Sequence, residues 1–163
     1  MYIGLLSDTH GVFSPQFRDF FAPVDQIWHA GDFGDLKTAQ EIAACKPLLG
    51  VYGNCDGQDI RLEHPGFRFF DCAGTKVLMT HIGGSPGHYY PEARELIRTY
   101  RPDVFVCGHS HILKVMMDHT WNCLYVNPGA AGIQGWHRVR TALRFQVDRD
   151  GIQKMEVFEL KRV

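Results

Sequence analysis

Short apolar segments alternate with amphipathic segments through the first two thirds of the chain. Segments 3–7, 26–30 and 48–52 have the length and apolar character of buried strands, and segments 15–21 and 36–45 between them are predicted helices. A strand–helix–strand–helix–strand order predicts a largely parallel sheet, because parallel neighbours need a long crossover connection. The carboxyl ends of these strands would then meet at one edge of the sheet.

Strands dominate the rest of the sequence. Segments 67–72 and 76–80, separated by Ala73-Gly74-Thr75, predict a hairpin, and segment 92–100 predicts a helix. Five further strands are expected at 104–107, 113–117, 123–126, 141–147 and 153–160. We therefore expect an α/β fold of two sheets with helices outside, in a single domain that spans residues 1–163.

Composition limits the partners and the cellular setting of such a chain. Its 163 residues are 45 % hydrophobic and 21 % charged, which suits one domain with a full core. The net charge of -1 argues against long nucleic acids and anionic membranes as partners. Five cysteines without a CxxC pair predict free thiols in a reducing compartment. Since no apolar run approaches the ~18 residues of a membrane span and no basic leader begins the chain, we expect a soluble, cytoplasmic protein.

Polar residues of the metal-binding type follow five of the apolar segments. They are Asp8-Thr9-His10, Gly31-Asp32, Gly53-Asn54-Cys55-Asp56, Thr80-His81 and Gly108-His109-Ser110-His111. Taken singly, Asp and Asn at strand ends are ordinary turn residues. Taken together they are not, because Gly-His-x-His is expected only ~0.05 times and Gly-Asn-x-Asp only ~0.02 times by chance in this composition.

The residue types indicate the chemistry. Carboxylate, imidazole and amide oxygen together suit borderline divalent ions such as Mn²⁺, Ni²⁺, Fe²⁺ or Zn²⁺, whereas the lack of a thiolate set argues against structural zinc. The candidate ligands are Asp8, His10, Asp32, Asn54, His81, His109 and His111. Seven such groups exceed what one ion can use, so we expect two divalent transition metal ions, with manganese favoured, sharing a bridging carboxylate. Two ions ~3.5–4 Å apart suit phosphoryl displacement, and their excess positive charge would attract an anionic substrate.

The ordered series of motifs resembles the calcineurin-like metallophosphoesterases, and most of all their small single-domain phosphodiesterase branch. The match covers residues 8–111, and Asn127-Pro128-Gly129 resembles a later loop of that branch. The resemblance implies a four-layer αββα sandwich of two mixed β-sheets flanked by helices. It also implies the ligand sets. By position, the first ion would be held by Asp8, His10, Asp32 and His111, and the second by Asp32, Asn54, His81 and His109, with Asp32 bridging.

One position departs from the wider family. Cys55 stands where most members have a His that protonates the leaving group, although the small phosphodiesterase branch shares the cysteine. A thiol with a pKa near 8.5 is a poorer proton donor than an imidazole near 6.5, and general acid catalysis is worth roughly 10²–10⁴-fold. We therefore expect turnover of activated or aryl diesters and weak turnover of alkyl monoesters. Catalytic roles are assigned to Asn54, Cys55, Asp56 and His109, Asp56 as a group that orients the site.

Two further residues are candidates for substrate contact. His88 follows the glycine-rich segment 83–87, which we interpret as a mobile loop close to His81. Arg138, with Arg140 beside it, lies beyond Asn127-Pro128-Gly129 and is expected to meet the second substituent of the phosphate. Among the other histidines, His29 ends an apolar segment and is expected in the core. Surface positions are expected for the rest, which are His64, His119 and His137.

The favoured function is a phosphodiesterase that uses in-line attack by a hydroxide bridging two divalent metal ions on a small phosphodiester. A phosphomonoesterase with the same metals is one alternative, which Cys55 disfavours. A non-catalytic scaffold, like the retromer subunit related to this family, is another, although all seven candidate ligands are intact here. A homo-oligomer is compatible with the sequence. A nuclease for long nucleic acids lacks the expected basic excess.

Overall fold

The computed structural model describes residues 1–162, and its first five-stranded sheet has the order β12-β11-β1-β2-β3. The parallel strands are β1 (Tyr2–Leu6), β2 (Gln26–His29) and β3 (Leu48–Gly50). Helices α1 (Pro15–Phe20) and α2 (Leu36–Cys45) make the crossovers. The antiparallel strands β11 (Val139–Asp148) and β12 (Gly151–Lys161) extend the sheet at its other edge.

The second five-stranded sheet has the order β4-β5-β8-β10-β9. Its strands are β4 (Phe67–Cys72), β5 (Thr75–Thr80), β8 (Val104–Val106), β9 (Leu113–Asp118) and β10 (Cys123–Pro128). The pairs β5–β8 and β8–β10 are parallel, and the outer pairs are antiparallel. Both sheets are therefore mixed, as the resemblance implied.

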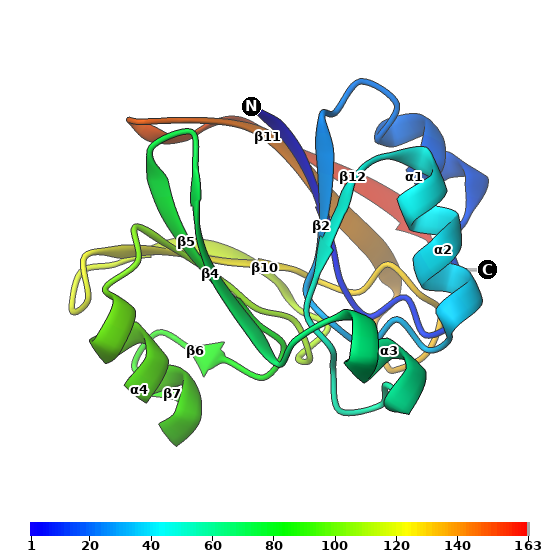
Figure 1. Cartoon of the computed structure of the whole chain (residues 1–163). Coiled ribbons are helices and arrows are strands. Elements are labelled where there is room, and N and C mark those ends of the chain that lie inside the picture. Colours follow the sequence, from blue (N-terminus) through cyan, green and yellow to red (C-terminus); the bar gives the residue numbers. More distant parts are fainter. Residues whose placement is uncertain (163) are drawn as a thin grey trace.

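The molecule has four layers, which are held together by three clusters of apolar residues (Figure 1). The core between the sheets includes Trp28 from the first sheet and Met79 from the second, both fully buried. Phe17 of α1 and Ile42 of α2 pack on the outer face of the first sheet, and Ile97 of α4 (Pro91–Tyr100) packs on the outer face of the second. Burial of a large apolar side chain stabilises a fold by roughly 1.5–3 kcal/mol, so these three interfaces hold the layers together. The predicted αββα sandwich is confirmed.

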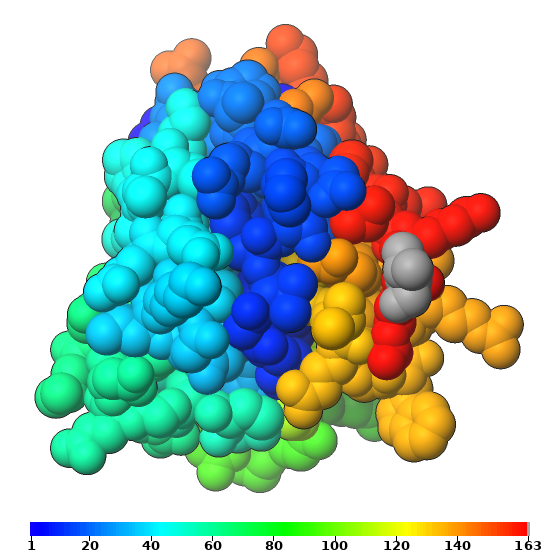
Figure 2. All heavy atoms as spheres, turned by 90° about the vertical axis from the view of Figure 1, so that its right-hand side faces the viewer, coloured from blue at the N-terminus to red at the C-terminus, as the bar shows by residue number. Residues whose placement is uncertain are grey.

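The chain's first residues lie between distant segments of the sequence. Figure 2 shows the N-terminal segment (blue) bordered by the α2 region (cyan) on one side and by the residues near 130 (orange) on the other. Backbone bonds from Ala131 N to Ser7 O and from Gly132 N to Asp8 O, both 2.9 Å, explain the second contact. The loop that follows β10 is thus fastened to the loop that follows β1.

Two short elements were not expected. Helix α3 (Gln58–Glu63) has only six residues and buries only Ile60, so the sequence offers little helical period to detect. Segment 83–87, interpreted as a mobile loop, instead begins a two-stranded hairpin of β6 (Gly84–Ser85) and β7 (His88–Tyr89). A turn with positive φ at Gly87 allows that hairpin to close tightly.

Two predicted surface positions were wrong or partly wrong. His64 is 7 % exposed rather than solvated, because its ring stacks on Phe33 with 4.7 Å between ring centroids. His137 is half-buried and bonds Gly132 O at 3.0 Å, whereas His119 is exposed as expected. His29 is fully buried, which confirms the prediction for it.

Two other predictions concern the whole chain. In the described part, the five cysteines are all free thiols. Among residues 1–162, no helix combines the length and the apolar character that crossing a bilayer requires.

Candidate metal centre

Parallel pairing continues past the ends of β1 and β2 into the two loops that carry the first candidate ligands. Asp8 N donates to Gly31 O at 2.9 Å, His10 N donates to Asp32 O at 3.1 Å, and Gly11 N donates to Phe33 O at 2.7 Å. These bonds fix Asp8 and His10 in register with Asp32. Two segments more than twenty residues apart in the sequence therefore present their side chains from one rigid platform.

Carboxylate and imidazole atoms converge at this platform. Asp8 Oδ1 lies 3.2 Å from His111 Nε2, and 3.9 Å from both His10 Nε2 and His81 Nε2. Asp32 Oδ2 lies 3.3 Å from His81 Nε2 and 3.8 Å from His10 Nε2. The structure thus brings together five of the seven predicted ligands, and each carboxylate faces more than one imidazole.

Asp8 supplies an observation that favours a cation. The residue is fully buried, and its Oδ1 atom has no hydrogen-bond donor among the described residues. A buried carboxylate oxygen without a donor is costly, and a metal ion would satisfy it. Ligand atoms of Asp8, His10 and His111 lie within 4.8 Å of one another, and so do those of Asp8, Asp32 and His81. The donor set and its spacing fit divalent metal ions.

The backbone is unusual at the same positions. Five candidate ligands have left-handed φ values, namely Asp8 (55°), His10 (45°), Asp32 (58°), His109 (68°) and His111 (59°). Such values are uncommon outside glycine and cluster at functional sites, where the surrounding structure holds the strain. The sharp turns that aim these side chains inward are therefore part of the site's construction.

Asp56 joins the loop that follows β2 to the loop that follows β3. Its Oδ2 accepts hydrogen bonds from Asp32 N at 2.9 Å and Gly53 N at 2.7 Å, and its Oδ1 accepts from Gly34 N at 3.0 Å. Each bond goes to a backbone N–H, so the side chain points at the loops and not into the cluster. Asp56 therefore braces the two loops against each other. A close approach explains the neighbouring glycine, since a Cβ on Gly53 would clash with Asp32 Oδ1.

Hydrogen bonds to the ring nitrogens orient two histidines. His81 Nδ1 lies 2.7 Å from Ala30 O, so it must donate there, which leaves Nε2 free to accept a metal. His29 Nδ1 accepts from Gly31 N at 3.1 Å, and its Nε2 lies 3.0 Å from Thr9 Oγ1. Burial lowers the pKa of His29 well below its usual value, so the ring is neutral and serves to brace the loops.

The close contacts in the cluster shift the pKa values of Asp32 and His81. Burial alone would raise the pKa of Asp32, but hydrogen bonding and the charge of His81 hold it well below the usual range. Burial likewise opposes protonation of His81, yet Asp32 and Asp8 raise its pKa. An Asp32 carboxylate that stays ionised in this site creates a strong demand for positive charge.

The remaining catalytic candidates are more exposed. Asn54 Oδ1 lies 3.1 Å from His81 Nε2, which places it beside the cluster. The His109 ring packs edge-on against His81 with 5.3 Å between centroids, and His109 N donates to Asp8 Oδ2 at 3.1 Å. The Cys55 sulfur lies within 4.8 Å of ligand atoms of His10 and Asp32, a proximity that its place in the motif did not reveal. Burial and the charge of Asp32 raise the pKa of the Cys55 thiol to about 11.

The end of β10 supports the Gly-His-Ser-His segment. Asn127 Nδ2 donates to Gly108 O at 2.9 Å and to Ser110 Oγ at 3.1 Å, and Asn127 Oδ1 accepts from Gly129 N at 3.0 Å. The residue is fully buried. Asn127 therefore acts on the ligand loop from behind, which gives the Asn127-Pro128-Gly129 motif a structural purpose.

The candidate substrate contacts His88 and Arg138 lie in two different hollows of the surface. His88 lines a pocket that it shares with His109. Arg138 is exposed in a separate hollow lined also by Trp136 and Arg162. Arg140 does not face substrate: it is 6 % exposed and its Nε donates to Ala131 O at 2.6 Å, so the expectation for it was wrong.

The sequence matches the family model described as the calcineurin-like phosphoesterase superfamily domain over residues 1–150. The chain belongs to this superfamily. No curated protein matches it. The superfamily places it with hydrolases of phosphoesters, and the clusters above are its candidate metal-binding residues.

Solved structures share the fold. An archaeal phosphodiesterase superposes with a TM-score of 0.74 at 23 % identity, covering 98 % of this chain and 100 % of that one. Vps29 from Entamoeba histolytica, as a single mutant, gives 0.75 at 16 % identity, covering 99 % and 100 %. Wild-type Vps29 from the same organism, complexed with Zn²⁺, gives 0.75 at 14 % identity and covers both chains fully. At these identities the likeness shows the fold alone.

Proposed function

We propose that the protein is a metal-dependent phosphodiesterase that hydrolyses a small phosphodiester at a centre for two divalent ions. The observation that carries this proposal is the convergence of two buried carboxylates and three imidazoles around Asp8 Oδ1, a buried oxygen with no donor among the described residues. Leaving such an oxygen without a donor would be costly in a purely structural turn. The likeness to a phosphodiesterase of the same fold supports it.

Each ion would have its own set of residues. Asp8, His10, Asp32 and His111 would hold one, and Asp32, Asn54, His81 and His109 would hold the other. The resemblance makes Asp32 the bridging candidate, and its Oδ2 faces His10 from one set at 3.8 Å and His81 from the other at 3.3 Å. When bound, two divalent ions activate a water and neutralise phosphate oxygens during an in-line displacement. Manganese is the expected ion, since oxygen and imidazole ligands suit it.

The chain's own residues divide the remaining work. The loop braces at Asp56, His29 and Asn127 keep the ligands oriented, which limits reorganisation during the reaction. Asn54, Cys55 and His109 are exposed and so are the residues that a substrate meets first. Cys55 is placed next to Asp32 by its N–H, which donates to Asp32 Oδ1 at 2.8 Å. We assign the thiol to the leaving-group side, where it is a weak proton donor.

A paired assay tests the proposal. The protein is loaded with Mn²⁺, the metal content per chain is measured, and hydrolysis of bis(p-nitrophenyl) phosphate is compared with that of p-nitrophenyl phosphate, with and without a chelator. We expect chelator-sensitive turnover that favours the diester. Fewer than one bound metal per chain together with no chelator-sensitive turnover would overturn the proposal. Turnover that favours the monoester would instead support a phosphomonoesterase.

A non-catalytic scaffold is the second candidate, and a specific observation favours considering it. Vps29 shares the fold over the full length of both chains and binds Zn²⁺ in one structure, so metal binding alone does not identify an enzyme. Metal binding without turnover of either ester in the paired assay would therefore favour the scaffold.

A further inference from the structure

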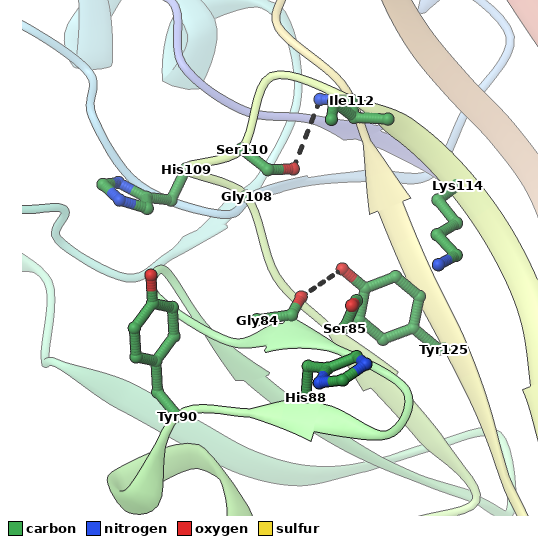
Figure 3. A pocket seen from close by; sticks show the side chains of 10 residues that line it. All are labelled: Gly84, Ser85, His88, Tyr90, Gly108, His109, Ser110, Ile112, Lys114 and Tyr125. Carbon is green, nitrogen blue, oxygen red and sulfur yellow. Dashed lines mark hydrogen bonds between the residues drawn. The ribbon is translucent and has the colours of Figure 1, made fainter.

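A pocket of about 480 Å³ lies beside the metal centre on the side of His109 (Figure 3). Figure 3 shows His109 and Tyr90 at one end of the pocket and Lys114 at the other, with His88 and Ser85 of the β6–β7 hairpin between them. Its volume falls in the range of small-molecule sites. His109 is thus shared between the metal centre and a separate hollow that the carboxylates do not line.

The lining of this pocket is cationic and hydrogen-bonding. Lys114 contributes an ammonium group, His88 and His109 contribute imidazoles, and Ser85 and Ser110 contribute hydroxyl groups. Among residues 1–162, no carboxylate lines the pocket or lies within ion-pair distance of Lys114. An ammonium that no carboxylate neutralises, in a concave site with hydroxyl donors, is suited to an anionic ligand.

The walls of the pocket are tied together. Tyr125 is 2 % exposed and its hydroxyl donates to Gly84 O at 2.7 Å, which fastens the hairpin to β10. Tyr89 donates to Asp118 Oδ2 at 2.8 Å, which fastens the hairpin to the end of β9, the strand that carries Lys114. His88 and Lys114 are therefore held on joined elements, and a ligand between them meets a preformed site.

We propose that this pocket binds a second anionic group of the substrate, a phosphate, phosphonate or carboxylate carried on the arm of the diester that is not the leaving group. The inference rests on the proposed function. The scissile phosphate would lie at the metal ligands, and the retained arm would pass His109 into the pocket. The leaving group has a different direction, because Cys55 is not among the residues that line the pocket.

The test uses three p-nitrophenyl phosphodiesters that share the leaving group and differ in the retained arm. The arms are ethyl (neutral), choline (cationic) and 2-phosphonoethyl (anionic, with a carbon–phosphorus bond that the enzyme cannot hydrolyse). We expect kcat/KM for the anionic arm to exceed that for the ethyl arm by about tenfold, mainly through KM, because a hydrogen bond to a charged group contributes roughly that factor.

Lys114→Gln should abolish this preference and leave the ethyl substrate unchanged within about twofold. Lys37→Gln is the matched control, because Lys37 is an exposed lysine on α2 paired with Glu41 and should keep the preference. Equal arm preferences in the wild type and in Lys114→Gln would overturn the inference. A wild-type preference for the ethyl or choline arm would also overturn it.

Failure of the proposed function would look different. If the Mn²⁺-loaded protein turned over none of the three diesters, the function would fail, and calorimetry with stable phosphonate analogues of the same diesters would decide the inference. Tighter binding of the anionic analogue that Lys114→Gln removes would support the pocket's role. Equal binding of all three analogues would overturn it.

Discussion

Asp8 and Asp32 are 0 % and 2 % exposed, whereas Asn54 and His109 of the same candidate centre are exposed to solvent. The buried pair follows the adjacent parallel strands β1 and β2 of the first sheet and is fixed by continued backbone pairing and by Asp56. The exposed pair lies on the loops after β3 and β8. One half of the site is built like a core, and the other like a surface.

The difference separates two tasks. Charges that must stay ionised and fixed belong in the buried half, where low exposure strengthens their attraction for a cation. Side chains that must admit and release a substrate belong in the exposed half. Substitutions should therefore affect stability and metal binding together in the buried half, and catalysis or specificity alone in the exposed half.

The largest effect is expected from Asp32→Asn. Asparagine tolerates the left-handed φ of 58° at this position and keeps an oxygen for Cys55 N. It removes, however, the negative charge that faces both proposed ligand sets. Diester turnover should fall by about 1,000-fold or more, and metal content should fall with it. Metal analysis and the bis(p-nitrophenyl) phosphate assay check this. Full activity in the variant would refute the bridging role.

Cys55→His tests the exposed half. An imidazole at the leaving-group side is a better proton donor, so turnover of an alkyl monoester, whose leaving group needs protonation, should rise by about 100-fold relative to the activated diester. The free energy of unfolding should change little because the side chain is exposed. The ratio of monoester to diester turnover is the measurement, with Cys55→Ser as the control. An unchanged ratio would remove Cys55 from proton transfer.

Asp56→Ala tests the brace of the buried half. The substitution leaves the N–H groups of Asp32, Gly53 and Gly34 without their acceptor, which should lower the free energy of unfolding by about 2–4 kcal/mol. Metal affinity should weaken by about 10–100-fold. Urea unfolding and metal titration report the two effects. Asp19→Ala, at an exposed position, is the control and should change neither.

The smallest effect is expected from Asn54→Ala in the metal-free protein. The side chain is exposed, so the free energy of unfolding should change by less than about 0.5 kcal/mol. The increase in Tm on adding Mn²⁺ should nevertheless shrink, because a proposed ligand is lost. Thermal unfolding with and without Mn²⁺ measures both. A full Mn²⁺ shift in the variant would exclude Asn54 as a ligand.

Much of the fold was predictable because its signals are local. Asp8, Asp32 and His81 each follow shortly after the end of an apolar strand. The same residues therefore indicate both where the strands end and where the site lies. A topology that collects strand ends then brings them together without further information. The convergence of Asp8, His10 and Asp32 follows from that rule, whereas His81 and His111 come from the second sheet and reach them through the packing of the two sheets.

The remainder depends on contacts between distant residues. Nothing near His64 in the sequence shows that Phe33 will cover it, and nothing near Arg140 shows that Ala131 O will accept its hydrogen bond. Lys114 is one charged residue among many in the sequence, and only the position of the β6–β7 hairpin gives it a pocket. Tertiary packing decided each of these cases.

The left-handed backbone at His10 and His111 also bears on how such a chain can change over generations. A non-glycine residue in that conformation costs roughly 1–2 kcal/mol, and glycine relieves the cost. Replacing either histidine by glycine would thus remove a proposed ligand and relax the metal-free fold in one step. On the backbone cost alone, the metal-free fold would then favour glycine at these positions, and the proposed metal binding is what histidine supplies in exchange.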